Sequence, residues 1–197
     1  YMADKILEYK QKYNLGFALY GTPSESLCDR FARVDKQEFG DIKGITDKGY
    51  YDNSFHVSSR INMSPFEKLR LEALGHKYSA GGHISYIETD SLTKNLEAIP
   101  EILRYAKMVG IHYMGINQPV DKCHICGYKG EFTATKEGFT CPQCGNHDSN
   151  EMSVIRRVCG YLSQPNARPF NKGKQEEIMH VINCTYGRKE KKSTRRW

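Results

Sequence analysis

Two pairs of cysteines constrain the fold of this chain more than any other feature. The pairs are CHIC at 123–126 and CPQC at 141–144, with fourteen residues between them. Two C-x2-C turns at such a spacing let four thiolates converge tetrahedrally on one metal ion. A glycine follows each pair, where a turn residue with positive φ is useful. The expected metal ligands are Cys123, Cys126, Cys141 and Cys144.

An all-sulfur tetrahedral set favours zinc, with iron in a rubredoxin-like site as the alternative. Four thiolates close the coordination shell, so neither His124 nor His147 is needed as a ligand. A closed shell also leaves no position for a reacting water, which predicts a structural rather than a catalytic metal. The residues between the pairs include EFTATKEGFT, a pattern typical of a hairpin. The region is therefore predicted to be a zinc ribbon that its metal holds together.

Composition narrows the class of protein further. The 197 residues are 39% hydrophobic and 26% charged, which is typical of a soluble globular chain. The sequence has neither a signal peptide nor an apolar run near the ~18–20 residues that span a bilayer, so we expect reduced thiols in the cytoplasm and no membrane partner. Much of the net charge of +6 lies in RKEKKSTRRW at 188–197. Such a tail can bind polyanions, but it is more often a solvated terminus.

Helical and strand-like patterns alternate from residue 1 to residue 120, which predicts an α/β fold, either layered or a barrel. The composition then shifts to Cys, Gly and Lys, so we divide the chain into an α/β part (1–120), a metal-held module (121–150) and a C-terminal segment (151–197). The first residues are already helical in pattern, which indicates a piece of something larger. The predicted helices are 1–15, 22–40, 64–78, 91–110 and 174–183, and the predicted strands lie at 16–21, late in 41–59, within 79–89, at 111–120 and, as strand or loop, at 153–163.

Capping residues predict where two of these helices begin. Ser64 is the expected cap of the helix over 64–78, and Thr22 that of the helix after residue 21, with Pro23 at the first helical position and Glu25 at the third. Where a strand turns into a helix, the free N–H groups of the first helical turn can bind a phosphate or a carboxylate. The same sequence pattern is equally consistent with a capped helix that binds no ligand. Asn53 and His56, at the start of a predicted strand, suit either substrate orientation or a structural role.

The segment RRVCGYL at 156–162 resembles the RVxGY-type signature of glycyl radical enzymes. Together with the cysteine pairs, LYGTPSESL at 19–27 and NSFHV at 53–57, it is similar to the C-terminal part of the class III anaerobic ribonucleoside-triphosphate reductases. The resemblance implies part of a glycyl-radical-enzyme α/β barrel, then a zinc-ribbon module and a C-terminal glycyl radical loop. It makes Gly160 the radical site, because a Cα radical on glycine is stabilised by its amide nitrogen and carbonyl and carries no side chain.

The same resemblance implies reduction of ribonucleoside triphosphates to deoxyribonucleotides, with formate as reductant. An activating enzyme that uses S-adenosylmethionine and an iron–sulfur cluster would install the radical. The complete enzyme would be a homodimer. The residues implied in contacts with substrate or formate are Tyr20, Thr22, Ser24, Glu25, Asn53 and His56.

The thiyl cysteine of the family has no clear counterpart in this chain. Cys28 lies inside a predicted helix rather than on a loop, and Cys159 and Cys184 have no assigned role. We therefore expect the thiyl cysteine and the nucleotide-sensing region in a further, N-terminal part of the reductase. Two alternatives are a non-catalytic zinc-ribbon protein that binds nucleic acid and a stand-alone glycyl radical subunit that completes another enzyme.

Overall fold

The computed structural model describes residues 1–23, 27–52, 54–89, 92, 95–135, 138–158, 161–163 and 170–180. Among these residues, no helix has the length and apolar character needed to cross a membrane. The helices are α1 (Met2–Tyr13), α2 (Cys28–Phe39), α3 (Pro65–Tyr78), α4 (Ala98–Val109), the 3-10 turn η2 (Ser149–Glu151) and α5 (Lys172–His180). The strands are β1 (Ser85–Glu88), β2 (Met114–Asn117), β3 (Asp121–Cys123), β4 (Lys129–Gly130), β5 (Thr133–Thr135), β6 (Gly138–Thr140), β7 (Met152–Ser153), β8 (Arg156–Val158) and β9 (Tyr161–Ser163).

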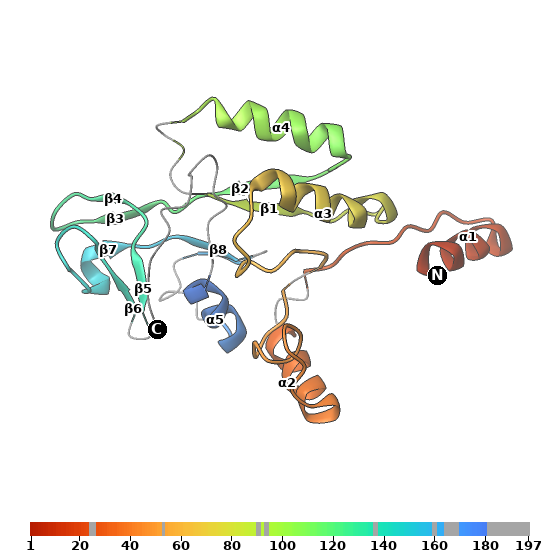
Figure 1. Cartoon of the computed structure of the whole chain (residues 1–197), viewed down its shortest axis with the longest axis horizontal. Coiled ribbons are helices and arrows are strands. Elements are labelled where there is room, and N and C mark those ends of the chain that lie inside the picture. Colours follow the sequence, from red (N-terminus) through yellow and green to blue (C-terminus); the bar gives the residue numbers. More distant parts are fainter. Residues whose placement is uncertain are drawn as a thin grey trace, which may run out of the picture.

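Within the α/β part, a parallel strand pair packs with helices α3 and α4 (Figure 1). β1 pairs with β2 so that Tyr86 lies opposite Gly115 and Glu88 opposite Asn117. Parallel strands need a long crossover, and α4 lies within it. α3 packs on both α4 and β1, and the shared core consists of Leu69, Ile87, Ile102 and Ala106.

The predicted start of α3 is confirmed. Ser64 Oγ accepts a hydrogen bond from Glu67 N at 3.2 Å, and Ser64 N donates to Glu67 Oε2 at 3.1 Å. This reciprocal capping box satisfies backbone donors that the first helical turn leaves free. Pro65 occupies the first turn, where its missing N–H costs nothing. Pro100 likewise lies in the first turn of α4, which begins at Ala98, so it does not interrupt that helix.

The predicted start of α2 is wrong. The helix begins at Cys28 with Leu27 as its cap, and Thr22 and Pro23 are not helical. The preceding segment has other hydrogen-bond partners, because Gly81 N donates to Leu19 O at 2.8 Å and Gly21 N donates to Gly82 O at 3.0 Å. The predicted strand at 16–21 does not form, since these two bonds do not continue into a ladder, and none forms late in 41–59 among the described residues.

The cysteine-containing module consists of small antiparallel sheets (Figure 1). β3 pairs with both β4 and β7, and β5 pairs with β6 as the predicted hairpin. Beyond this module, β8 and β9 pair so that Arg157 lies opposite Leu162 and Val158 opposite Tyr161. α5 packs on α2 and β8. The core of the cysteine module consists of Cys123, Phe132, Phe139, Cys141, Met152 and Val154.

Candidate metal centre and the strand pair beside it

The four predicted metal ligands converge in space. The Sγ atoms of Cys123, Cys126, Cys141 and Cys144 all lie within 4.8 Å of one another. Cys123 Sγ is 3.7 Å from Cys144 Sγ, and Cys126 Sγ is 3.6 Å from Cys141 Sγ. A tetrahedral zinc with Zn–S bonds of about 2.3 Å has S···S edges of about 3.8 Å, whereas a disulfide requires about 2.05 Å. The arrangement therefore fits a tetrahedral metal and not a pair of disulfides.

Each cysteine turn closes through a glycine with positive φ. Gly127 N donates to Cys123 O at 3.0 Å and Gly145 N donates to Cys141 O at 2.9 Å, with φ angles of 75° and 72°. Backbone N–H groups, first that of Cys126, donate to the Cys123 sulfur and lower the pKa of that thiol to about 6. Although a backbone N–H also faces the sulfur of Cys126 and that of Cys144, burial and the neighbouring thiols raise the pKa of both. Without a metal the cluster thus favours one thiolate, and a bound metal would stabilise the others.

The two nearby histidines have other partners. His124 Nε2 lies 3.0 Å from Ser153 Oγ, and His147 Nδ1 lies 3.5 Å from Gly145 O. Neither belongs to the described cluster of potential ligand atoms. The donor set is thus four thiolates, which suits zinc in a closed, structural site.

A buried carboxylate joins the cysteine module to β8. Asp121, which is 1% exposed, accepts hydrogen bonds from Phe132 N at 2.8 Å and from Ile155 N at 3.2 Å. Its Oδ1 also pairs with Arg156 Nη1. The guanidinium of Arg156 lies 4.9 Å from the centre of the Phe139 ring, within the core of the cysteine module. The first residue of β8 is therefore attached to the folded metal module.

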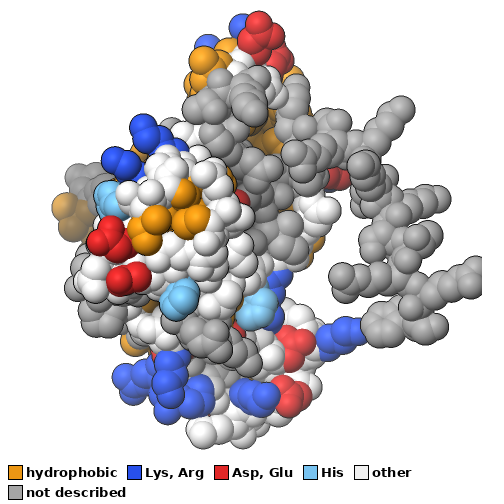
Figure 2. All heavy atoms as spheres, turned by 90° about the vertical axis from the view of Figure 1, so that its left-hand side faces the viewer, with side chains coloured by type: hydrophobic (Ala, Val, Ile, Leu, Met, Phe, Trp, Pro, Cys, Tyr) orange, Lys and Arg blue, Asp and Glu red, His pale blue; other side chains and the backbone are white. Residues whose placement is uncertain are grey.

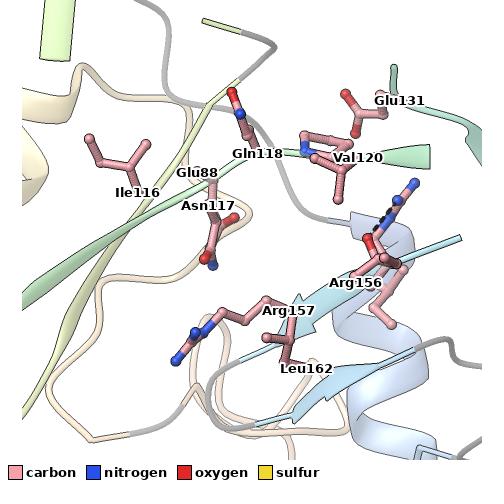
Figure 3. Close-up of a pocket in the computed structure, with 12 residues that line it drawn as sticks. Glu88, Ile116, Asn117, Gln118, Val120, Glu131, Arg156, Arg157 and Leu162 are labelled. Atoms are coloured by element: carbon pink, nitrogen blue, oxygen red, sulfur yellow. Dashed lines mark hydrogen bonds between the residues drawn. The ribbon is translucent and has the colours of Figure 1, made fainter. Parts of the chain in front are cut away.

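The second residue of β8 is attached to the α/β part instead. Arg157 Nη2 donates to Tyr86 Oη at 2.6 Å, and its guanidinium lies 4.7 Å from the centre of the Tyr86 ring. Figure 3 shows Arg156 and Arg157 pointing away from each other, as neighbouring side chains on a strand do. Cys159 and Gly160 lie between β8 and β9 in the sequence and outside the described residues.

A cavity of about 240 Å³ lies beside this strand pair, between the α/β part, the cysteine module and α5 (Figure 3). Its lining includes Glu88, Asn117, Arg157 and Leu162. Asn117 Nδ2 donates to Glu88 Oε1 at 3.0 Å. Burial nevertheless raises the pKa of Glu88 to about 7. This carboxyl group can therefore exchange a proton near neutral pH beside the strand that leads to Gly160.

The structure brings the two predicted substrate segments together. A side chain added at Gly21 would approach Ser54 Oγ to 2.5 Å, so LYGTP and NSFHV are neighbours. Tyr20 and Thr22 are exposed, while His56 lies 3.7 Å from Glu72 Oε1. Ser24, Glu25 and Asn53 lie outside the described residues, and the substrate role of the whole set stays a prediction.

Sequence reasoning missed the partner of Arg157. By its place in the pattern Tyr86 is an apolar position of its strand, and it is buried at 5% exposure. A signal was present, because Tyr86 and Glu88 alternate with Ile87 and so place two polar groups on one face of β1. The pairing of Tyr86 with Arg157, 71 positions away, follows only from the fold.

Comparison with known proteins defines the class of fold. An anaerobic ribonucleotide reductase of known structure matches 92% of this chain and 27% of its own length, with a TM-score of 0.67 and 21% identity. The crystal structure of the anaerobic ribonucleotide reductase from Thermotoga maritima with glycerol in the active site matches 89% of this chain and 26% of its own, with a TM-score of 0.62 and 22% identity. At these identities the likeness concerns the fold alone.

Sequence comparison then gives the family. The sequence model of the anaerobic ribonucleoside-triphosphate reductases matches residues 1–180, and the chain belongs to this family. It is 50% identical over 175 residues to the anaerobic ribonucleoside-triphosphate reductase of Escherichia coli K12, covering 89% of this chain and 24% of that protein. It is 47% identical over 177 residues to that of Enterobacteria phage T4, covering 90% and 29%. The chain thus spans about a quarter of the length of these relatives.

Proposed function

We propose that this chain is the C-terminal part of an oxygen-sensitive reductase that converts ribonucleoside triphosphates to deoxyribonucleotides, with a stored radical on Gly160. The observation that carries the proposal is the attachment of β8, the strand that leads to Gly160, to a four-thiol centre in a chain of the reductase family. Glycine suits radical storage because its Cα radical is stabilised by the adjoining amide nitrogen and carbonyl, with no side chain to prevent a planar geometry.

The residues of this chain have separate roles in the proposed reaction. The four cysteines bind a structural zinc, which when bound fixes the fold of the module around them. Substrate and formate lie against the neighbouring segments 19–25 and 53–57, within an α/β barrel to which β1 and β2 belong. The proximity of Gly21 and Ser54 supports this placement. The residues proposed to contact substrate or formate are Tyr20, Thr22, Ser24, Glu25, Asn53 and His56.

The remaining reductase supplies the thiyl cysteine. Cys28 is unsuited to that role, because it is 3% exposed within α2 and burial raises the pKa of its thiol. An activating enzyme with an iron–sulfur cluster and S-adenosylmethionine removes one hydrogen atom from the Cα of Gly160. The complete enzyme is a homodimer, and its reduced metal-binding thiols suit the cytoplasm.

Electron spin resonance on the complete reductase tests the proposal. Anaerobic activation is expected to give a doublet-type glycyl signal that Gly160→Ala abolishes. Oxygen should then cleave the activated chain near Gly160, which a denaturing gel detects. Gly16→Ala is a matched control, because an added Cβ there meets no atom within 4 Å, and its signal should equal that of the wild type. A full signal in Gly160→Ala would refute the assignment.

Family membership favours this function over nucleic-acid binding by a zinc ribbon, since the matched residues 1–180 include both the ribbon and the α/β part. On the described part of the face that Figure 2 shows, Lys and Arg side chains lie in a few separate groups, one of them a cluster at the lower left. Residues 188–197, on which the nucleic-acid hypothesis depended, lie outside the described residues.

A further inference from the structure

We infer that Tyr86 is a positioning residue that fixes the β8–β9 pair, and with it Gly160, against the α/β part. The inference rests on the proposed function, because it assigns Tyr86 a role in radical transfer from Gly160. The contact that carries it is the hydrogen bond of 2.6 Å from Arg157 Nη2 to Tyr86 Oη, with the guanidinium also lying over the ring. A charged donor and a cation–π contact on one side chain are together stronger than an ordinary neutral hydrogen bond.

The ring of Tyr86 is itself held in place by its strand partner. Gly115 lies opposite Tyr86 on β2, and a Cβ added to Gly115 would come within 3.0 Å of Tyr86 Cε1 and 3.1 Å of Cδ1. That approach is closer than ordinary van der Waals contact, and the rigid ring cannot yield as a flexible chain end would. A glycine on β2 therefore leaves the space that the ring occupies.

A second support for the ring comes from α3. The His56 ring stacks on that of Tyr86, with centroids 5.7 Å apart and planes inclined by 28°. His56 Nδ1 faces Glu72 Oε1 at 3.7 Å, and this carboxylate also accepts from Val57 N at 2.9 Å and lies 3.4 Å from Lys68 Nζ. Helix α3 and its buried Glu72 thus support His56, which in turn supports Tyr86. The hydroxyl that Arg157 meets belongs to a rigid platform rather than to a mobile surface side chain.

The short distance along the chain connects this contact to the radical site. Gly160 follows Arg157 by three residues, so their Cα atoms can be at most about 10 Å apart. The Tyr86–Arg157 contact is therefore close to Gly160 along the chain, whatever the conformation of the residues between them. Radical transfer depends on the distance between donor and acceptor, and a misplacement of about 1 Å in a reacting group can reduce a rate about 100-fold.

The test uses the complete reductase, activated anaerobically, and measures three quantities: zinc content, glycyl radicals per chain and turnover per radical. Tyr86→Phe removes the hydroxyl and keeps the ring. We expect unchanged zinc content and a fall of about 10-fold to 100-fold in the product of radical yield and turnover per radical. Gly115→Ala, which displaces the ring without removing the hydroxyl or the arginine, should act in the same direction. The matched control is Tyr51→Phe, which removes a hydroxyl that donates to Asp35 Oδ2 at 2.7 Å in another part of the fold.

Radical yield and turnover per radical that both stay within twofold of the wild type and of Tyr51→Phe would overturn the inference. A folding defect is recognised by loss of zinc and of the wild-type circular dichroism. In that case Gly115→Ala decides the question. If its radical yield and its turnover per radical equal those of the wild type, the inference about the Tyr86 ring is also overturned. Failure of the proposed function looks different, because the glycyl signal would then be absent from the wild type or would persist in Gly160→Ala.

Discussion

Truncation of Asp121 should loosen the junction between the metal module and β8. In Asp121→Ala, the N–H groups of Phe132 and Ile155 and the guanidinium of Arg156 lose their shared acceptor. The carboxylate is completely buried and the Arg156 side chain is 12% exposed, so water can compensate only in part. Removing one partner of a buried ion pair typically costs about 3–5 kcal/mol. We take the lower figure, about 3 kcal/mol, because Arg156 retains some access to solvent and can still donate to the carbonyl groups of Phe132 and Ile155.

Native-state hydrogen exchange measures this loss where it occurs. A local destabilisation of about 3 kcal/mol should accelerate exchange of the Phe132 and Ile155 amides about 100-fold, since each 1.4 kcal/mol is a factor of ten. Asp148→Ala is the matched control, because its carboxylate accepts a backbone bond from Asn150 N at 2.9 Å on the exposed surface. That variant should change the same two amides less than about fivefold, since an exposed cap is worth about 1 kcal/mol and is remote from them. An acceleration below about fivefold in Asp121→Ala would refute the reasoning.

Two further predictions concern the metal and a titrating carboxyl group. The chain should bind one equivalent of zinc, which is colourless. The Cys126→Ser variant should lose its zinc to a chromogenic chelator at chelator concentrations that leave the wild type loaded. Equal retention of zinc by the two proteins would contradict a four-thiolate site. The pKa of Glu88 rises on folding from 4.5 to about 7, so the folded state keeps a proton that the unfolded state loses. The contribution of Glu88 to the unfolding free energy should therefore decrease as pH rises from about 4.5 to about 7, by up to about 3 kcal/mol, and level off above that. Urea unfolding at pH 5 and pH 8 measures this, and the unfolding free energy of Glu88→Gln should lack the decrease. Unfolding free energies that change with pH in parallel in the two proteins would contradict the prediction.

Features whose cause is local were predictable from the sequence. The spacing of the cysteines determines the geometry of the turns that carry them, so the four ligand residues could be named in advance. The capping box of α3 depends on two residues three positions apart. The β5–β6 hairpin likewise joins neighbouring segments, and its pairing appears as expected.

Features that depend on distant contacts were not predictable. Thr22, Pro23 and Glu25 form a good local capping pattern, but α2 begins at Cys28, where Tyr51 N donates to Cys28 O at 3.1 Å. The same end of α2 lies close to α5, because a Cβ added to Gly173 would approach Asp29 Cβ to 2.9 Å. Tertiary packing here outweighs a local preference worth about 1 kcal/mol.

The two adjacent arginines of β8 attach the strand that precedes Gly160, the proposed radical site, to two different parts of the fold. Neighbouring side chains on a strand point to opposite faces, so Arg156 reaches Asp121 in the metal module while Arg157 reaches Tyr86 in the α/β part. A strand held on one face only could still rotate or slide about its single attachment. Attachment on both faces restrains Arg156 and Arg157 more than attachment on one face would, provided that each anchoring body is itself rigid. Both parts have a hydrophobic cluster, but two of the buried residues in the cysteine module, Cys123 and Cys141, are also potential metal ligands, so its core and its proposed metal site share residues. On the proposed function, a zinc bound by the four thiols would stabilise the module that holds Arg156 through Asp121, and with it the strand that precedes Gly160 in the sequence.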